Sequence, residues 1–68
     1  MESLLVIFRI ACPVNVDGTP CGETNRIFQI SKGIHDIDLG DIKDCHPVSQ
    51  TVLVENTSPD APKVVTFT

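Results

Sequence analysis

The dipeptide Asp17-Gly18 is the feature that most constrains the fold of this chain. Apolar and polar residues alternate before it at positions 14–16, and the pattern resumes after Gly22 at positions 26–30. An Asp-Gly pair flanked by alternating residues is the strongest short-range signal of a β-hairpin that a single sequence can give. The sequence therefore predicts a chain that folds through strands and tight turns.

The register of this hairpin also bears on the three cysteines of the chain. A two-residue turn places Val14 opposite Cys21, so Cys12 and Cys21 become a diagonal pair that is too far apart for easy disulfide formation. A longer loop would remove this objection. With Cys45 as the third cysteine, a monomer keeps at least one free thiol, and we expect a reducing, cytoplasmic location.

Runs typical of β-strands recur along the chain, at 4–10, 13–17, 26–30, 34–39, 49–55 and 63–68, and turn residues separate them. At 68 residues the chain has room for one domain, which we place at 1–68. Short strands at this spacing predict an all-β fold, a small antiparallel β-sandwich of Greek-key type with six or seven strands. The predicted core residues are Val14, Val16, Phe28, Ile30, Ile37, Leu39, Val52, Val54, Val65 and Phe67.

The first run is apolar on both of its faces. Its even positions, from Leu4 to Ile10, occupy one face, while Leu5 and Ile7 occupy the other. Such a strand is either covered on both sides or part of an interface, and so short a chain has difficulty covering it twice. Leu53 also faces away from the predicted core side. The sequence therefore predicts a protein partner or a homo-oligomer docked on Leu5, Ile7 and Leu53.

Charge and hydropathy argue against two classes of partner. The net charge is −4, and the five basic residues are spread along the chain, so no cluster is available to neutralise nucleic-acid phosphates or to bind an acidic membrane surface. No apolar run approaches the roughly 20 residues that span a bilayer. The run at 4–8 is also a poor signal peptide, because Glu2 precedes it and Arg9 ends it. We expect a soluble protein without membrane insertion.

A second hypothesis is a small zinc-binding protein, because thiolates and imidazole are the ligands that Zn²⁺ prefers. The candidate ligands are Cys12, Cys21, Cys45 and His46. Their number fits a tetrahedral site, but their spacing lacks a C-x₂₋₄-C motif, and adjacent residues on a strand point apart. Free thiols are the simpler interpretation, and we expect no cofactor.

The histidines invite a catalytic interpretation with Cys45 or Ser49 as nucleophile. However, His35 shares its strand face with Ile37 and Leu39, which predicts a partly buried histidine whose hydrogen bonds go to the backbone. The chain has no glycine-rich phosphate loop and leaves little room for a pocket of a few hundred cubic ångströms. We therefore expect no catalytic residues and no enzymatic activity.

Between Val14 and Phe67 the chain carries a series of short motifs, namely Val16-Asp17-Gly18, Gly22-Glu23-Thr24, Gly33-Ile34-His35, Pro47, Thr51-Val52-Leu53-Val54 and Val64-Val65-Thr66-Phe67. The order of these motifs resembles the PEGA domain, a small β-sandwich module of many bacterial and archaeal surface and regulatory proteins. The resemblance implies a non-catalytic interaction module. Two positions differ: Ser31-Lys32-Gly33-Ile34 replaces the Pro-Glu-Gly-Ala signature, and Asn25 stands where a proline usually follows Thr24.

Overall fold

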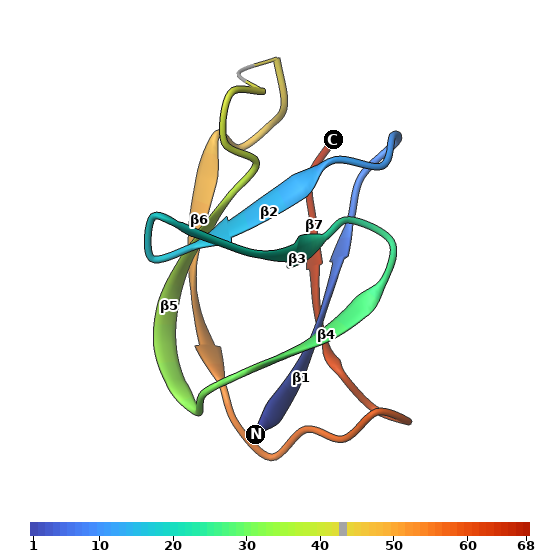
Figure 1. Cartoon of the computed structure of the whole chain (residues 1–68), viewed down its shortest axis with the longest axis vertical. Coiled ribbons are helices and arrows are strands. Elements are labelled where there is room, and N and C mark those ends of the chain that lie inside the picture. The colour runs from blue at the N-terminus through green and yellow to red at the C-terminus, as the bar shows by residue number, and fades with distance from the viewer. Residues whose placement is uncertain (43) are drawn as a thin grey trace.

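A computed structural model describes residues 1–42 and 44–68. The described residues form seven strands in two sheets and no helix (Figure 1), which confirms the predicted small all-β sandwich. The first sheet has the order β4-β1-β7 and the second β3-β2-β5-β6. The strands are β1 (Glu2–Ile7), β2 (Pro13–Val16), β3 (Thr19–Glu23), β4 (Ile27–Ile30), β5 (Gly33–Asp38), β6 (Ser49–Val54) and β7 (Lys63–Thr66).

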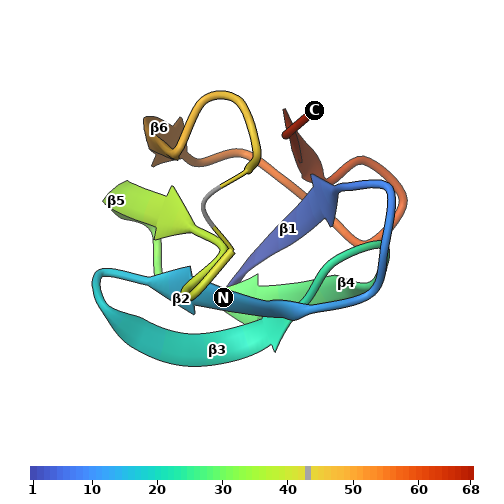
Figure 2. The same cartoon turned by 90° about the horizontal axis from the view of Figure 1, so that it is seen from above.

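The chain passes repeatedly between the two sheets. Figure 2 shows β5 and β6 on one side of the molecule and β1, β4 and β7 on the other. The crossings run from β1 to β2, from β3 to β4, from β4 to β5 and from β6 to β7. The described part of the chain contains no helix that is long and apolar enough to cross a membrane.

One strand pair differs from the antiparallel sheets that the sequence predicts. β1 and β7 are parallel, with a register that runs from Leu4 opposite Lys63 to Ile7 opposite Thr66. A tight hairpin forces its two strands to run in opposite directions, but β1 and β7 lie far apart in the chain and share no turn. Their direction is set by packing in the sandwich, which local sequence patterns do not report.

The Asp17-Gly18 turn has the predicted two-residue form. Val16 pairs with Thr19 directly across it. Asp17 has a φ of 53° and Gly18 a φ of 83°. Positive φ at both central residues is the requirement of a type I′ turn, whose twist matches that of the flanking strands. The hairpin prediction is therefore confirmed at the turn.

Beyond the turn, the predicted register is wrong. Val14 pairs with Gly22 rather than with Cys21, because a β-bulge between Val14 and Asn15 in the pairing shifts the register. The segment 19–22, which turn chemistry predicted as a loop, is strand β3. It lies at the edge of the second sheet, where Pro20 is tolerated despite its missing N–H.

The core lies between the sheets and contains every residue predicted for it, with Phe28 and Val52 partly buried. Even positions of β1 add to it as the face alternation predicts, but Ile10 is 51% exposed because β1 ends at Ile7. The observed core is therefore larger than the set of ten residues predicted for it. The further members are Leu4, Val6, Phe8, Cys12 and Cys45, with Ile42 packed against them.

Asn25 fastens the β3–β4 connection to the end of β1. Its main-chain N–H donates to Val6 O (2.6 Å), its Nδ2 donates to Phe8 O (2.9 Å), and its Oδ1 accepts from Phe8 N (3.2 Å). Its φ is 65°. Proline has no N–H and a φ fixed near about −65°, so it could not replace Asn25 in this conformation.

Candidate functional site

The outer face of the first sheet carries an apolar row that crosses all three strands. Leu5 of β1 pairs with Ile27 of β4 on one side and with Val64 of β7 on the other. Ile27 is 46% exposed and Val64 is 52% exposed, while Leu5 is partly buried between them. The row is therefore continuous and open to solvent.

The rest of this face is uncharged. Its other outward positions are held by Ile7, Gln29 and Thr66 and by Ser3, which is buried and whose N–H donates to Thr57 Oγ1 (2.7 Å). The two polar side chains of one row satisfy each other, because Gln29 Nε2 donates to Ser3 Oγ (2.9 Å). None of the outward residues of the three described strands carries a formal charge. Leu5 and Ile7, both predicted from sequence, thus belong to a neutral and largely apolar surface.

Leu53 lies on a different surface from Leu5 and Ile7. It belongs to β6 of the second sheet and pairs across the strands with Ile34 of β5. Leu53 is 50% exposed and Ile34 is 70% exposed, so Leu53 does point outward as predicted. However, the two sheets turn their outer faces in opposite directions, and the three predicted interaction residues do not form one site.

Beside Ile34 and Leu53, the outer face of the second sheet carries two carboxylates that are hydrogen-bonded within the sheet. Asp36 Oδ1 accepts a hydrogen bond from Thr51 Oγ1 (2.7 Å), and Asp38 Oδ1 accepts one from Asn15 Nδ2 (3.2 Å). These bonds link β5 to its two neighbours in the sheet. The carboxylates therefore have partners supplied by the chain itself.

A polar cluster of different character surrounds His35, which is only 9% exposed. Its Nδ1 donates to Asp17 Oδ2 (2.6 Å), and its Nε2 donates to the main-chain oxygen of Ser31 (2.8 Å). The Ser31 hydroxyl is farther from Nε2, at 3.4 Å. The prediction of a buried histidine with a backbone partner is confirmed, whereas the carboxylate partner was not predicted.

The cluster has the residue types of a Ser-His-Asp triad but a different bonding pattern. In such a triad, Nε2 takes the proton of the serine hydroxyl. Here Nε2 faces the carbonyl oxygen of Ser31, so it carries a proton and is not placed to accept one from that hydroxyl. Cys45 is not part of this cluster, since its thiol lies 3.6 Å from Ile42 O.

The pKa shifts of His35 and Asp17 both favour the charged form of the histidine. The hydrogen bond to Asp17, aided by that to Ser31 O, raises the pKa of His35 above its ordinary value of 6.5 despite desolvation. The Asp36 N–H and then His35 lower the pKa of Asp17 below its ordinary value of 3.8. Asp17 and His35 thus form an ion pair at pH values between the lowered pKa of Asp17 and the raised pKa of His35.

The proposed zinc ligands do not converge. Cys12 and Cys45 are buried in the core, whereas Cys21 and His46 are exposed. Among residues 1–42 and 44–68, no group of three or more histidine, cysteine or acidic side chains is arranged to hold a metal ion. Within the described residues, the four candidate ligands are thus divided between core and solvent.

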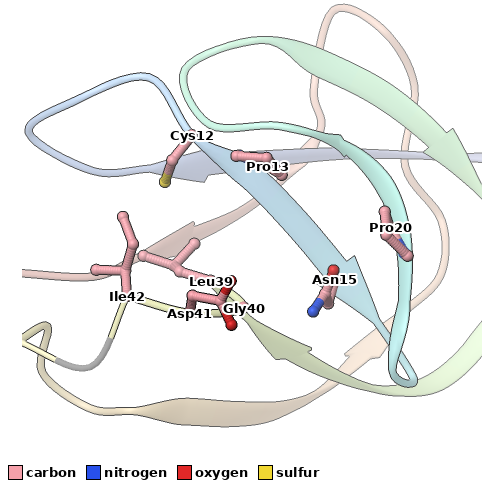
Figure 3. Close-up of a pocket in the computed structure, with 8 residues that line it drawn as sticks. All are labelled: Cys12, Pro13, Asn15, Pro20, Leu39, Gly40, Asp41 and Ile42. Atoms are coloured by element: carbon pink, nitrogen blue, oxygen red, sulfur yellow. The ribbon is translucent and has the colours of Figure 1, made fainter.

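A pocket of about 320 Å³ lies beside β2, where the segment after β5 folds back (Figure 3). Sequence reasoning predicted too little room for a pocket of this size, and that prediction is wrong. The amide of Asn15 is already bonded to Asp38, and neither His35 nor Asp17 lines the pocket. The lining residues are Cys12, Pro13, Asn15, Pro20, Leu39, Gly40, Asp41 and Ile42.

Among these features, the outer face of the first sheet is the best candidate for binding a macromolecule, because its apolar row crosses all three strands and is exposed to solvent at Ile27 and Val64. The bonding of the His35 cluster is internal, and the pocket presents few free polar groups. Comparison of the chain with known protein families, with curated protein sequences and with solved structures finds no match.

Proposed function

We propose that this chain is a non-catalytic interaction module that binds a protein partner, or a second copy of itself, through the outer face of its first sheet. The observation that carries the proposal is the apolar row of Ile27, Leu5 and Val64 across all three strands. Contiguous apolar surface on a small domain is a mark of a partner site. The absence of formal charge on the described outward positions lowers the desolvation cost of covering them.

The size of the face limits the strength of binding. A standard interface removes about 800 Å² of surface from each partner. That is about a fifth of the 4001 Å² that this chain exposes in total. Because the face consists of only three strands of four to six residues, we expect the interaction to be weak or transient.

Two further points support an interaction role over catalysis. The histidine best placed for proton transfer has both ring nitrogens engaged, by Asp17 and by Ser31 O. The resemblance of the sequence to the PEGA domain also implies a non-catalytic module. The interaction surface in this proposal consists of Leu5 and Ile7 with Ile27 and Val64, and Leu53 lies outside it.

The test compares two substitutions that are chemically identical but lie on opposite faces. Leu5→Glu places a charge at the centre of the apolar row, and Leu53→Glu places one on the outer face of the second sheet. We expect Leu5→Glu to weaken association at least tenfold, about 1.4 kcal/mol, because the carboxylate would have to be desolvated on binding. Leu53→Glu should leave association unchanged.

Association is measured in two ways, by light scattering across a concentration series and by cross-linked capture of partners on the immobilised chain. Urea unfolding of each variant shows that the fold is intact. A wild-type chain that stays monomeric at high concentration and captures nothing would contradict the proposal. So would a variant pair in which only Leu53→Glu loses binding.

A further inference from the structure

We propose that His35 and Asp17 form a charge-dependent lock that holds the β2–β3 turn against β5, and that loss of a proton from His35 releases the turn. Three hydrogen bonds join Asp17 to β5. Its Oδ2 accepts from His35 Nδ1 (2.6 Å), its Oδ1 accepts from Asp36 N (2.9 Å), and its main-chain N–H donates to Asp36 O (2.8 Å). Beyond the pairing of Asn15 and Val16 with β5, these three bonds of Asp17 attach the turn itself.

The two acceptors around the imidazole require both ring nitrogens to carry a proton. Nδ1 faces the Asp17 carboxylate and Nε2 faces the Ser31 carbonyl, at 2.6 and 2.8 Å. A neutral imidazole has one N–H and one lone pair. Deprotonation therefore sets a lone pair against an oxygen on one side of the ring. Since His35 is 9% exposed, little water can enter to relieve this contact without local opening.

The surroundings of His35 leave Asp17 as the dominant charge. The strands on either side of β5, Pro13–Val16 and Ser49–Val54, contain no titratable side chain. On β5 itself, Asp36 bonds to Thr51 on the opposite face of the sheet. Lys32 is the charged residue in the turn before β5, and its electrostatic effect falls on Glu2.

The direction of the pH dependence follows from these contacts. Because the pKa of His35 is raised above 6.5 in the folded chain, the contribution of the lock is fully present below pH 6.5 and is lost as pH rises through the raised value. Because the pKa of Asp17 is lowered below 3.8, its contribution is present above pH 3.8 and is lost as pH falls through the lowered value. The lock is therefore strongest between pH 3.8 and 6.5.

The experiment follows the histidine and the turn together. Nitrogen NMR of the imidazole distinguishes the doubly protonated ring from either neutral tautomer, and hydrogen exchange reports the protection of the Asp17 and Asp36 amides. We expect an imidazolium that persists above pH 6.5. Protection factors at the two amides, corrected for intrinsic exchange, should then fall by roughly tenfold for each unit by which the raised pKa exceeds 6.5.

Asp17→Asn is the matched variant. Asparagine tolerates the positive φ of the turn and keeps an oxygen for Asp36 N, while its amide can donate to a neutral Nδ1. In this variant, His35 should be neutral at pH 7. The hydrogen-exchange protection of the Asp36 amide should then no longer change as His35 titrates. His46→Gln removes the other histidine and should leave the titration of His35 unchanged.

Three results would overturn the lock. The first is a neutral His35 ring in the wild-type chain at pH 6. The second is amide protection in the turn that stays constant while His35 titrates. The third is an Asp17→Asn chain whose His35 titrates as in the wild type.

Discussion

The outer faces of the two sheets are both exposed to solvent, but their side chains differ in polarity and in hydrogen bonding. On the second sheet, Asp36 and Asp38 project from β5, and each accepts a hydrogen bond from a neighbouring strand, supplied by Thr51 and Asn15. On the first sheet, Ile27, Leu5 and Val64 lie in one row and present apolar surface to solvent. The carboxylates of the second face are bonded within the sheet beside one exposed apolar pair, Ile34 and Leu53, whereas the row of the first face is apolar across all three strands and gains stability if something covers it.

The difference shows what alternation along a strand can and cannot indicate. Both faces consist of outward positions in regular strands, so both satisfy the same period-two pattern. Only the identity of cross-strand neighbours separates a self-bonded polar face from an apolar row. The function of such a surface is therefore decided by register, which is a property of the fold.

The largest change in stability is expected from substitutions at two adjacent residues that lie on opposite faces of β1. Leu4 is fully buried, so Leu4→Ala should cost about 2–5 kcal/mol, enough to unfold much of so small a domain. Leu5→Ala should cost less than about 1 kcal/mol, because Leu5 is only partly buried. Urea unfolding followed by circular dichroism measures both. Equal costs would show that the outer face is packed like the core and is not free for a partner.

A smaller effect is expected where the two sheets meet. Gly22 of β3 lies against the ring of Phe28 of β4, and a Cβ at position 22 would overlap that ring. Gly22→Ala should therefore destabilise the chain by about 1–3 kcal/mol through overpacking. Thermal unfolding provides the measurement, with Cys21→Ala at the exposed neighbouring position of β3 as control. A stability equal to that of the wild type would mean that the sheets can separate here without cost.

The smallest effect belongs to the outer face of the second sheet. Thr51→Val removes the hydroxyl that donates to Asp36 but keeps the β-branched shape. Because the bond is exposed, water replaces it, and the free energy of unfolding should change by no more than about 0.5 kcal/mol. Denaturant unfolding at matched ionic strength checks this value. A loss above about 1 kcal/mol would mean that the self-bonded face contributes to stability as well as to solvation.

Sequence patterns predicted the layers of this protein better than its connections. The alternation of β5 placed His35 and Ile37 inward, and that of β1 placed Leu5 outward. The same alternation assigns Ile27 to the outer face once Phe28 and Ile30 are placed in the core, so this member of the apolar row could have been found. Such inferences succeed because alternation is a local property of the strand.

Longer-range features could not be predicted in this way. Strand β3 was missed because Pro20 and Gly22 favour turns, and its edge position, which tolerates them, is known only from the fold. Leu53 was correctly placed outward, but alternation does not say which sheet a strand joins. The carboxylate beside His35 comes from Asp17, which only the type I′ turn and the pairing of β2 with β5 bring within reach.

The parallel pairing of β1 and β7 also has a mechanical consequence. Because the strands point the same way, Glu2 and Thr66 lie at opposite ends of the pair, as Figure 1 shows for the two strands. Tension applied between those two residues would load the hydrogen bonds of this ladder in shear, all at once. An antiparallel pair pulled from the same end would instead open like a zip, one bond after another, so the geometry of β1 and β7 favours resistance to stretching.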